Sequence, residues 1–124
     1  MFAVNTHDAQ RSDNNVTGTI LVQNEAADAL FDSGATHSLV FPHFAPKLNK
    51  ERQLLDIPLS VDTPMGESVD VNYFYPDCVI EIDNNILCAD LIELPVLELD
   101  VILGMDWLSR HRVVIDCYRK KVRF

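Results

Sequence analysis

The chain has 124 residues, 48% of them hydrophobic, which fits one compact domain. Its formal net charge of -9 would repel nucleic-acid phosphates and anionic membrane surfaces, so we expect neither as a partner. It has no run of about 18 or more apolar residues, and its first twenty residues lack the basic start and apolar core of a signal peptide. We therefore expect a soluble protein that is not secreted. Three cysteines without a C-x-x-C pair are expected to be reduced: Cys78, Cys88 and Cys117.

Short runs of β-branched and aliphatic residues, separated by turn formers, predict an all-β sandwich or barrel. Residues 1–15 are polar after Val4 and predict a loose N-terminal arm, and residues 16–124 predict a single folded domain. We expect strands at 16–23, 27–31, 38–41, 56–61, 68–74, 78–82, 85–94, 100–103, 112–117 and 121–124. One short helix is expected at 105–111, after Gly104, and a shorter turn at 42–48 is limited by two prolines.

A turn with proline and glycine at its tip separates the strands expected at 56–61 and 68–74. Its central residues are Pro64, Met65 and Gly66, which favour a tight change of chain direction. The sequence therefore predicts a β-hairpin that projects from the body of the domain.

The apolar run that ends at Phe31 stops abruptly at Asp32-Ser33-Gly34. A charge at the tip of a buried strand is costly unless something pairs with it or uses it. The triplet alone is weak evidence of function, because an ordinary Asx-type turn also explains it. Its context is more specific, since a projecting hairpin, an apolar-apolar-glycine run (Ile102-Leu103-Gly104) and a short helix follow in that order.

This order resembles the retropepsin-type aspartic proteases, and most of all the protease of Ty3/gypsy-like LTR retrotransposons. The resemblance is carried by residues 30–38 (LFDSGATHS) and 101–108 (VILGMDWL), and it spans roughly residues 16–124. It implies the retropepsin-like acid protease barrel, with one short C-terminal helix and a flap hairpin. It also implies an aspartic endopeptidase that processes a retroelement polyprotein, located in the cytoplasm or within virus-like particles.

Peptide hydrolysis by two carboxylates requires that they share one proton, so that one accepts a proton from water while the other supports the developing gem-diol. The Asp-Ser-Gly triplet occurs once in the chain, and Asp62-Thr63-Pro64 is no second copy because proline lacks the backbone N–H and the freedom of glycine. The second carboxylate must then come from an identical chain. We therefore expect a homodimer with Asp32 as the catalytic residue of each subunit.

The resemblance assigns roles to the neighbours of Asp32. The Ser33 hydroxyl is expected to bond across to the partner's loop, Gly34 to bring its N–H to the carboxylate, and Ala35 to keep the site floor small. Retroviral relatives often carry an acid at the next position, where this chain has Thr36, so a weaker grip on the substrate is expected.

Two further segments have roles implied by the resemblance. Leu103 and Gly104 are expected to pack behind the catalytic loop. Pro64, Met65 and Gly66 are expected to form the tip of a flap that closes over an extended polypeptide substrate.

Other interpretations are kept open. The chain could be a domesticated or degenerate copy that serves as a dimerisation or peptide-binding module, or a cellular retropepsin-like protease. Asp106 is expected to cap or face solvent beside the short helix, and Trp107 to lie in the core. The four histidines match no metal motif, and neither a metal nor another cofactor is expected: His7, His37, His43 and His111.

Overall fold

The computed structural model describes residues 2–3, 15–62, 67–95 and 99–124, and most of these form strands. The strands are β1 (Phe2–Ala3), β2 (Asn15–Val22), β3 (Glu25–Asp32), β4 (Leu39–Val40), β5 (Gln53–Asp62), β6 (Ser68–Cys78), β7 (Ile80–Ile82), β8 (Asn85–Ile86), β9 (Ala89–Glu93), β10 (Val101–Leu103), β11 (Val114–Asp116) and β12 (Lys121–Arg123). The helical elements in the described ranges are a 3-10 turn η2 (Ala45–Leu48) and the α-helix α1 (Met105–Arg110). The all-β prediction with one short helix near the C-terminus is confirmed.

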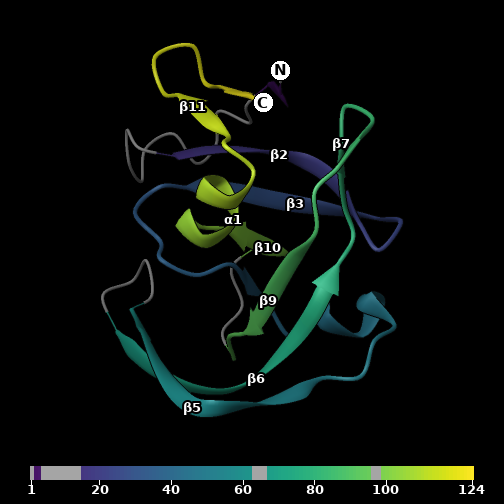
Figure 1. Ribbon diagram of the computed structural model, residues 1–124, viewed down its shortest axis with the longest axis vertical. Coiled ribbons are helices and arrows are strands. Elements are labelled where there is room, and N and C mark those ends of the chain that lie inside the picture. The colour runs from purple at the N-terminus through teal and green to yellow at the C-terminus, as the bar shows by residue number, and fades with distance from the viewer. Residues whose placement is uncertain (1, 4–14, 63–66, 96–98) are drawn as a thin grey trace.

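The larger sheet has nine strands in the order β5-β6-β9-β4-β10-β3-β2-β7-β8. Strand β3 lies inside it, antiparallel to β2 and parallel to β10. Figure 1 shows β5 and β6 as a long curved hairpin along one end of the molecule, with α1 between this hairpin and β11. The sheet therefore curves around the strand that leads to Asp32.

Two tight hairpins follow directly from local sequence. Val22 pairs with Glu25, and Ile82 pairs with Asn85, so each turn has two central residues. Those residues have positive φ angles in both turns: Gln23 and Asn24 in the first, Asp83 and Asn84 in the second. Asparagine and aspartate tolerate this conformation better than most residues, which explains why the chain turns at these points.

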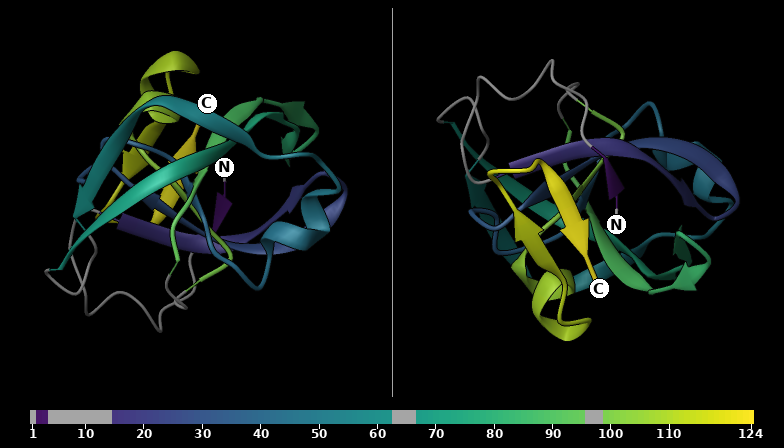
Figure 2. Two further views of the ribbon diagram at one scale, coloured as in Figure 1. Left: turned by 90° about the horizontal axis from the view of Figure 1, so that it is seen from below. Right: turned by 90° about the horizontal axis from the view of Figure 1, so that it is seen from above.

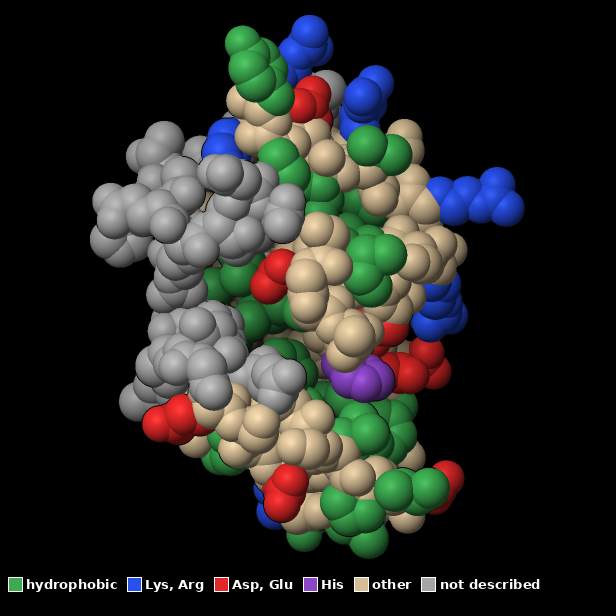
Figure 3. Space-filling view, turned by 90° about the vertical axis from the view of Figure 1, so that its left-hand side faces the viewer, with side chains coloured by type: hydrophobic (Ala, Val, Ile, Leu, Met, Phe, Trp, Pro, Cys, Tyr) green, Lys and Arg blue, Asp and Glu red, His purple; other side chains and the backbone are tan. Residues whose placement is uncertain are grey.

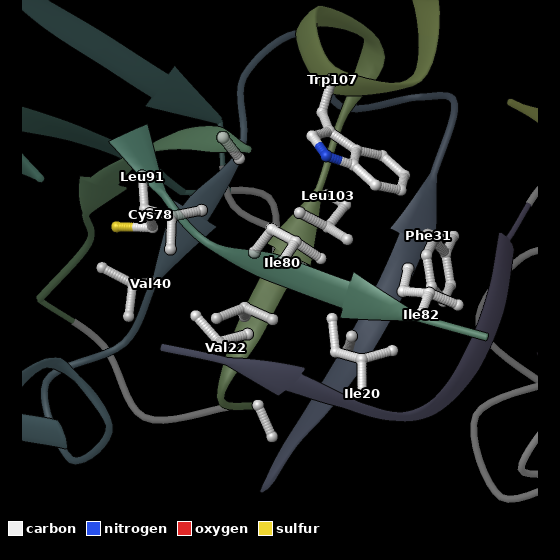
Figure 4. Close-up of a cluster of buried hydrophobic side chains, with 14 of the residues drawn as sticks. Ile20, Val22, Phe31, Val40, Cys78, Ile80, Ile82, Leu91, Leu103 and Trp107 are labelled. Carbon is white, nitrogen blue, oxygen red and sulfur yellow. The ribbon is translucent and has the colours of Figure 1, made fainter. Parts of the chain in front are cut away.

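The central strands are buried on both faces. One core cluster includes Phe31, Leu103 and Trp107, and Figure 4 shows these side chains together with those of β2, β6 and β7. The second cluster, on the opposite face, includes Leu30 and Ile102 and extends to the β5–β6 hairpin. Because side chains alternate between the two faces of a strand, burial on both faces requires the nearly continuous apolar runs seen in this sequence.

Several predicted strand boundaries are wrong. The strand expected at 56–61 begins at Gln53, and the strand expected at 85–94 is divided into β8 and β9. The division has a physical reason, because the carbonyl of Leu87 accepts a hydrogen bond from Trp107 Nε1 (2.9 Å), and that of Cys88 contacts His111 Nε2 (2.9 Å). The backbone carbonyls of Leu87 and Cys88, between β8 and β9, are therefore bonded to side chains of the α1 region instead of to a neighbouring strand.

The cysteine prediction is consistent with the structure. All three cysteines are free, and Cys78 is opposite Ala89, not Cys88, in the β6–β9 pair. Cys78 is fully buried within the main core. It therefore behaves as a small apolar side chain.

A small separate sheet joins the two ends of the chain, in the order β1-β12-β11. Phe2 pairs with Val122, and Figure 2 shows β1 beside the C-terminal hairpin. The terminal strand predicted at 121–124 is confirmed as β12. The predicted loose arm falls mainly on residues 1 and 4–14, which lie outside the described residues, and stays a prediction. No helix in the described ranges is long and apolar enough to cross a membrane.

Candidate active site

Asp32 lies at the carboxyl end of β3, one residue after the fully buried Phe31. The parallel pairing of Phe31 with Leu103 fixes this end of the strand against β10. The side chain of Asp32 is half-buried, in contrast to the fully buried side chains before it. Because β3 is buried on both faces, its backbone is fixed, and the Asp32 carboxylate lies at the point where the strand leaves the core.

The turn after Asp32 is built around its carboxylate. The Gly34 N–H donates to Asp32 Oδ1 (2.8 Å), and the Ala35 N–H donates to the Asp32 carbonyl (3.2 Å). A Cβ atom added to Gly34 would lie 3.1 Å from Asp32 Oδ1, closer than an ordinary contact. Position 34 thus has an N–H directed at the carboxylate, and a side chain there would press against Asp32 Oδ1. The role expected of this glycine stays a prediction.

The start of α1 is bonded to the loop from behind. The Met105 N–H donates to the Ala35 carbonyl (2.7 Å), and the Asp106 N–H donates to the Thr36 carbonyl (3.2 Å). These two N–H groups belong to the first turn of the helix, where they have no partner within the helix. The loop therefore supplies the acceptors that the helix lacks, and the helix fixes the position of the loop.

Gly104 is the point of closest approach between the two segments. An added Cβ atom would lie 2.5 Å from the His37 carbonyl oxygen and 2.7 Å from the Ala35 carbonyl oxygen. Both contacts are with backbone, which cannot move aside as a flexible side chain can. Leu103, the residue before Gly104, is fully buried and pairs with Phe31 of β3. The role of Leu103 and Gly104 in supporting the catalytic loop stays a prediction.

A buried polar pair completes this connection. Ser38 is fully buried, and its hydroxyl donates to Asp106 Oδ1 (2.7 Å) and accepts from the Gly104 N–H (3.0 Å). The Ser38 N–H donates to Asp106 Oδ2 (3.2 Å), and Trp107 N–H donates to Asp106 Oδ1 (2.7 Å). The Asp106 carboxylate thus joins the end of the loop to the first turn of α1.

Ser38 and Asp106 were not predicted as site residues. Asp106 was expected only to cap the helix or face solvent, and its bonds to Ser38 show a larger structural role. The signal was present as a polar residue next to the apolar run Leu39–Phe41, but its partner is 68 positions away along the chain. The expectation that Trp107 lies in the core is confirmed.

The predicted projecting hairpin exists as the pair β5–β6. Its strands are paired as far as Asp62 and Ser68. The expected flap-tip residues Pro64, Met65 and Gly66 lie outside the described residues. The described residues therefore form the paired strands on which the expected flap tip would be carried.

Two of the described histidines have structural partners. The imidazole of His43 contacts the carboxylate of Asp100, the residue before β10, and His111 contacts the Cys88 carbonyl. Among the described residues, no three His, Cys, Asp or Glu side chains are grouped so that they could hold a metal ion.

Comparison with known protein families gives a match over residues 1–124 to the model described as retroviral aspartyl protease. The chain belongs to this family. Family membership implies aspartic peptidase chemistry. Comparison with curated protein sequences finds no match.

Two solved structures show a similar fold. EIAV protease in complex with the inhibitor HBY-793 is 17% identical, with a TM-score of 0.62 over 77% of this chain and 86% of that one. The retroviral protease-like domain of Ddi1 from Leishmania major is 13% identical, with a TM-score of 0.63 over 87% of this chain and 86% of that one. The predicted retropepsin-like fold is confirmed by these likenesses.

Proposed function

We propose that this chain is an aspartic endopeptidase that is active as a homodimer, with one Asp32 from each subunit at a shared reaction centre. The observation that carries the proposal is the position of Asp32. It is a single carboxylate at the edge of a two-sided core, with the Gly34 N–H directed at it and its loop bonded to α1 from behind. Such a rigidly placed group suits a reaction that needs two carboxylates at a fixed distance.

In the proposed mechanism, the two Asp32 carboxyls share one proton. The ionised carboxylate accepts a proton from water as the water attacks the peptide carbonyl, and the protonated one donates a hydrogen bond to the developing gem-diol. The Gly34 N–H holds the orientation of each carboxylate, and Ser33 is assigned a bond across the dimer. Ala35 keeps the floor of the site small, and Thr36 stands where an acid would grip the substrate backbone, so that grip is weaker here. Leu103 and Gly104 support the loop from behind.

The proposed substrate is a polypeptide in extended conformation, bound between the Asp32 loop and the β5–β6 hairpin. The residues proposed for the flap tip, Pro64, Met65 and Gly66, would close over it and exclude water. No cofactor is assigned. As a finer proposal, the chain is the protease segment of a Ty3/gypsy-type retroelement polyprotein, acting in the cytoplasm or within its particles, with residues 16–124 as the protease domain.

A cellular retropepsin-like protease is the second candidate. The likeness to the Ddi1 domain, which covers 87% of this chain, favours it as an alternative to a retroelement enzyme. A peptide-binding or dimerisation module without catalysis is the third. These candidates differ in substrate or in chemistry while sharing the fold.

Cleavage of an apolar peptide library tests the chemistry. We expect the wild-type chain to cleave and Asp32→Asn to lose at least about a thousandfold in rate, because the amide cannot serve as the base. Asp90→Asn, a change at an exposed carboxylate remote in sequence, is the matched control and should keep its activity. Equal rates for wild type and Asp32→Asn, or no cleavage by either, would favour the module.

The pH profile of cleavage provides a second readout. One of the two carboxyls must hold a proton, so the rate should be highest in mildly acidic solution and fall as the pH rises and that proton is lost. A rate that keeps rising into alkaline solution contradicts the shared-proton mechanism.

A further inference from the structure

A groove of about 380 Å³ lies between β2 and the β7–β8 hairpin. Its lining includes Thr19 and Leu21 from β2, Glu81 from β7, and Asp83 and Asn84 from the turn after β7. The structure describes no Lys or Arg in this lining.

The groove is distant from the candidate active site. Leu21 pairs with Ala26, and Asp32 ends the same strand, β3, six positions later. A strand rises about 3.3 Å per residue, so the two sites are separated by roughly 20 Å along β3. Figure 1 shows the β2–β3 turn and the β7–β8 hairpin on the side of the molecule away from the loop that follows β3. A ligand in the groove therefore occupies a site of its own.

Strand register places an acidic side chain between two exposed aliphatic ones. Leu21 lies opposite Glu81 in the β2–β7 pair, and Glu81 lies opposite Ile86 in the β7–β8 pair. Side chains directly opposite each other in antiparallel strands point to the same face of the sheet, so these three form one row across it. Leu21 keeps 36% of its surface exposed and Ile86 keeps 63%. The sheet thus presents a carboxylate with apolar surface on both sides.

The carboxylate of Glu81 is unpaired within the described part of the chain. Its side chain is half-buried, yet it makes no hydrogen bond or ion pair with any described residue. Two more carboxylates are close, because Asp83 lines the groove and Asp28 Oδ1 accepts a hydrogen bond from Thr19 Oγ1 (3.3 Å). Figure 3 shows another side of the molecule, where Lys and Arg side chains gather in the half towards β11. The groove therefore has a negative charge that calls for a cation from outside the chain.

A lysine or arginine side chain of another polypeptide complements this row. Its aliphatic stem can lie on Leu21 and Ile86 while its charged end pairs with the Glu81 carboxylate. Apolar residues beside it would cover the exposed methyl groups of the row. A second copy of this chain is a poorer occupant, because each copy has a net charge of -9 and would bring further carboxylates to the same face.

We propose that this groove is an exosite, a second binding site away from the reaction centre, for a Lys or Arg side chain flanked by apolar residues in the polypeptide substrate. The inference rests on the proposed function, because it takes a polypeptide as the substrate. It adds that a basic residue outside the cleaved segment strengthens substrate binding. An extended chain covers the distance of roughly 20 Å between the groove and Asp32 with about six residues.

Two short peptides that differ in one side chain test the binding. The probes are the capped peptide Ala-Leu-Arg-Leu-Ala and the same peptide with citrulline in place of arginine, which keeps the shape of the side chain and removes its charge. Both are titrated into Asp32→Asn protein, so that no probe is cleaved, and the methyl NMR signals of Leu21 and Ile86 report binding at the groove. We expect the arginine peptide to bind at least about fivefold more tightly than the citrulline peptide.

Glu81→Gln, made in the same Asp32→Asn protein, removes the charge from the groove. The side chain is only half-buried and has no described partner, so the variant should fold. We expect it to bind the two peptides with affinities within about twofold of each other. Glu51→Gln is the matched control, since it removes one exposed carboxylate just before β5, the outer strand at the other end of the nine-stranded sheet. It should keep the full preference for arginine.

Cleavage kinetics test the role in substrate binding. In a peptide that the wild type cleaves, a Leu-Arg-Leu segment is placed about six residues from the cleaved bond, on either side in turn. In one of the two positions we expect it to lower KM by at least about threefold and to leave kcat unchanged, because it adds binding that is equal in the ground state and the transition state. Glu81→Gln should remove this gain.

The outcomes separate this inference from the proposed function. Equal affinities of the two peptides, unshifted methyl signals of Leu21 and Ile86, or a preference for arginine that Glu81→Gln leaves intact would overturn the exosite, while the protease proposal stands. An unchanged KM with the segment on either side would overturn its role in substrate binding. If the preference for arginine depends on Glu81 but the wild type cleaves no peptide, the protease proposal fails and the binding site stands.

Discussion

The Asp32 loop and the C-terminal hairpin are connected to the rest of the chain in different ways. The loop is bonded to α1 by backbone and side-chain hydrogen bonds, and Gly104 leaves no space between them. The hairpin of β11 and β12 leaves Val114 half exposed and Tyr118 95% exposed. The chain is thus tightly packed behind the candidate catalytic residue, whereas side chains of the C-terminal hairpin stay exposed to solvent. This contrast supports the proposal of a reaction centre assembled from two identical chains.

The largest expected effect comes from filling the space at Gly104. Gly104→Ala places a Cβ atom against two backbone carbonyl oxygens, so we expect the free energy of unfolding to fall by about 3 kcal/mol. Chemical denaturation of the two proteins measures the difference.

Gly34→Ala is the control for this change. Its Cβ atom would meet only the Asp32 carboxylate, at 3.1 Å, so stability should fall by less than about 1 kcal/mol while cleavage is impaired. Equal losses of stability at positions 34 and 104 would contradict the tight connection between the loop and α1.

The next effect concerns the buried hydroxyl of Ser38. Ser38→Ala removes the donor to Asp106 and leaves the buried Gly104 N–H without its acceptor, so we expect a loss of about 2 kcal/mol in the free energy of unfolding. Ser109→Ala, at an exposed position of α1, should have little effect. A stable Ser38→Ala protein would show that this polar connection does not fix the loop.

The free energy of unfolding is expected to depend on pH through the buried Cys78 thiol. Burial raises the pKa of the Cys78 thiol from its ordinary value of 9.0 to about 12, and the nearby Lys50 ammonium only partly opposes this. Between about pH 9 and pH 12, the Cys78 thiol thus keeps its proton in the folded state and loses it in the unfolded state. Stability from this group is fully present below about pH 9 and is lost as the pH rises towards 12.

Denaturation between pH 8 and 12 measures this slope. Burial also raises the pKa of Tyr75, which adds to the loss above about pH 10. Cys78→Ala should be less stable at neutral pH and should lose less stability across this range, whereas Cys88→Ala should keep the wild-type slope. Identical slopes for wild type and Cys78→Ala would exclude the thiol as the cause.

The smallest effect on stability is expected at the hairpin. Val114→Lys should change the free energy of unfolding of the single chain by no more than about 0.5 kcal/mol, because the side chain is already exposed. Denaturation at concentrations where the protein is monomeric checks this. A large loss would show that Val114 belongs to the packing of its own chain.

Much of the fold could be predicted from local sequence. The apolar runs around Phe31 and Leu103 indicate strands buried on both faces, and the Asp83-Asn84 pair indicates a hairpin turn. The division between β8 and β9 could not be predicted, because it depends on bonds from Trp107 and His111, which are distant in sequence.

The candidate site, like the fold, could be predicted only in part from the sequence. The Asp32-Ser33-Gly34 triplet and Gly104 could be recognised from their order along the chain. The bond between Ser38 and Asp106 could not, because it joins two positions 68 residues apart without a distinctive motif. Contacts that depend on tertiary packing are visible only once the strands are assembled.

Mixing wild-type chains with Asp32→Asn chains tests most directly whether the reaction centre is shared. At concentrations well above the dimer dissociation constant, a ninefold excess of Asp32→Asn leaves only about a tenth of the wild-type chains with a wild-type partner. We expect peptide cleavage by a fixed amount of wild type to fall to about a tenth. Cleavage that is unchanged by the excess would show that one chain holds a complete centre, and would contradict a centre shared between two chains.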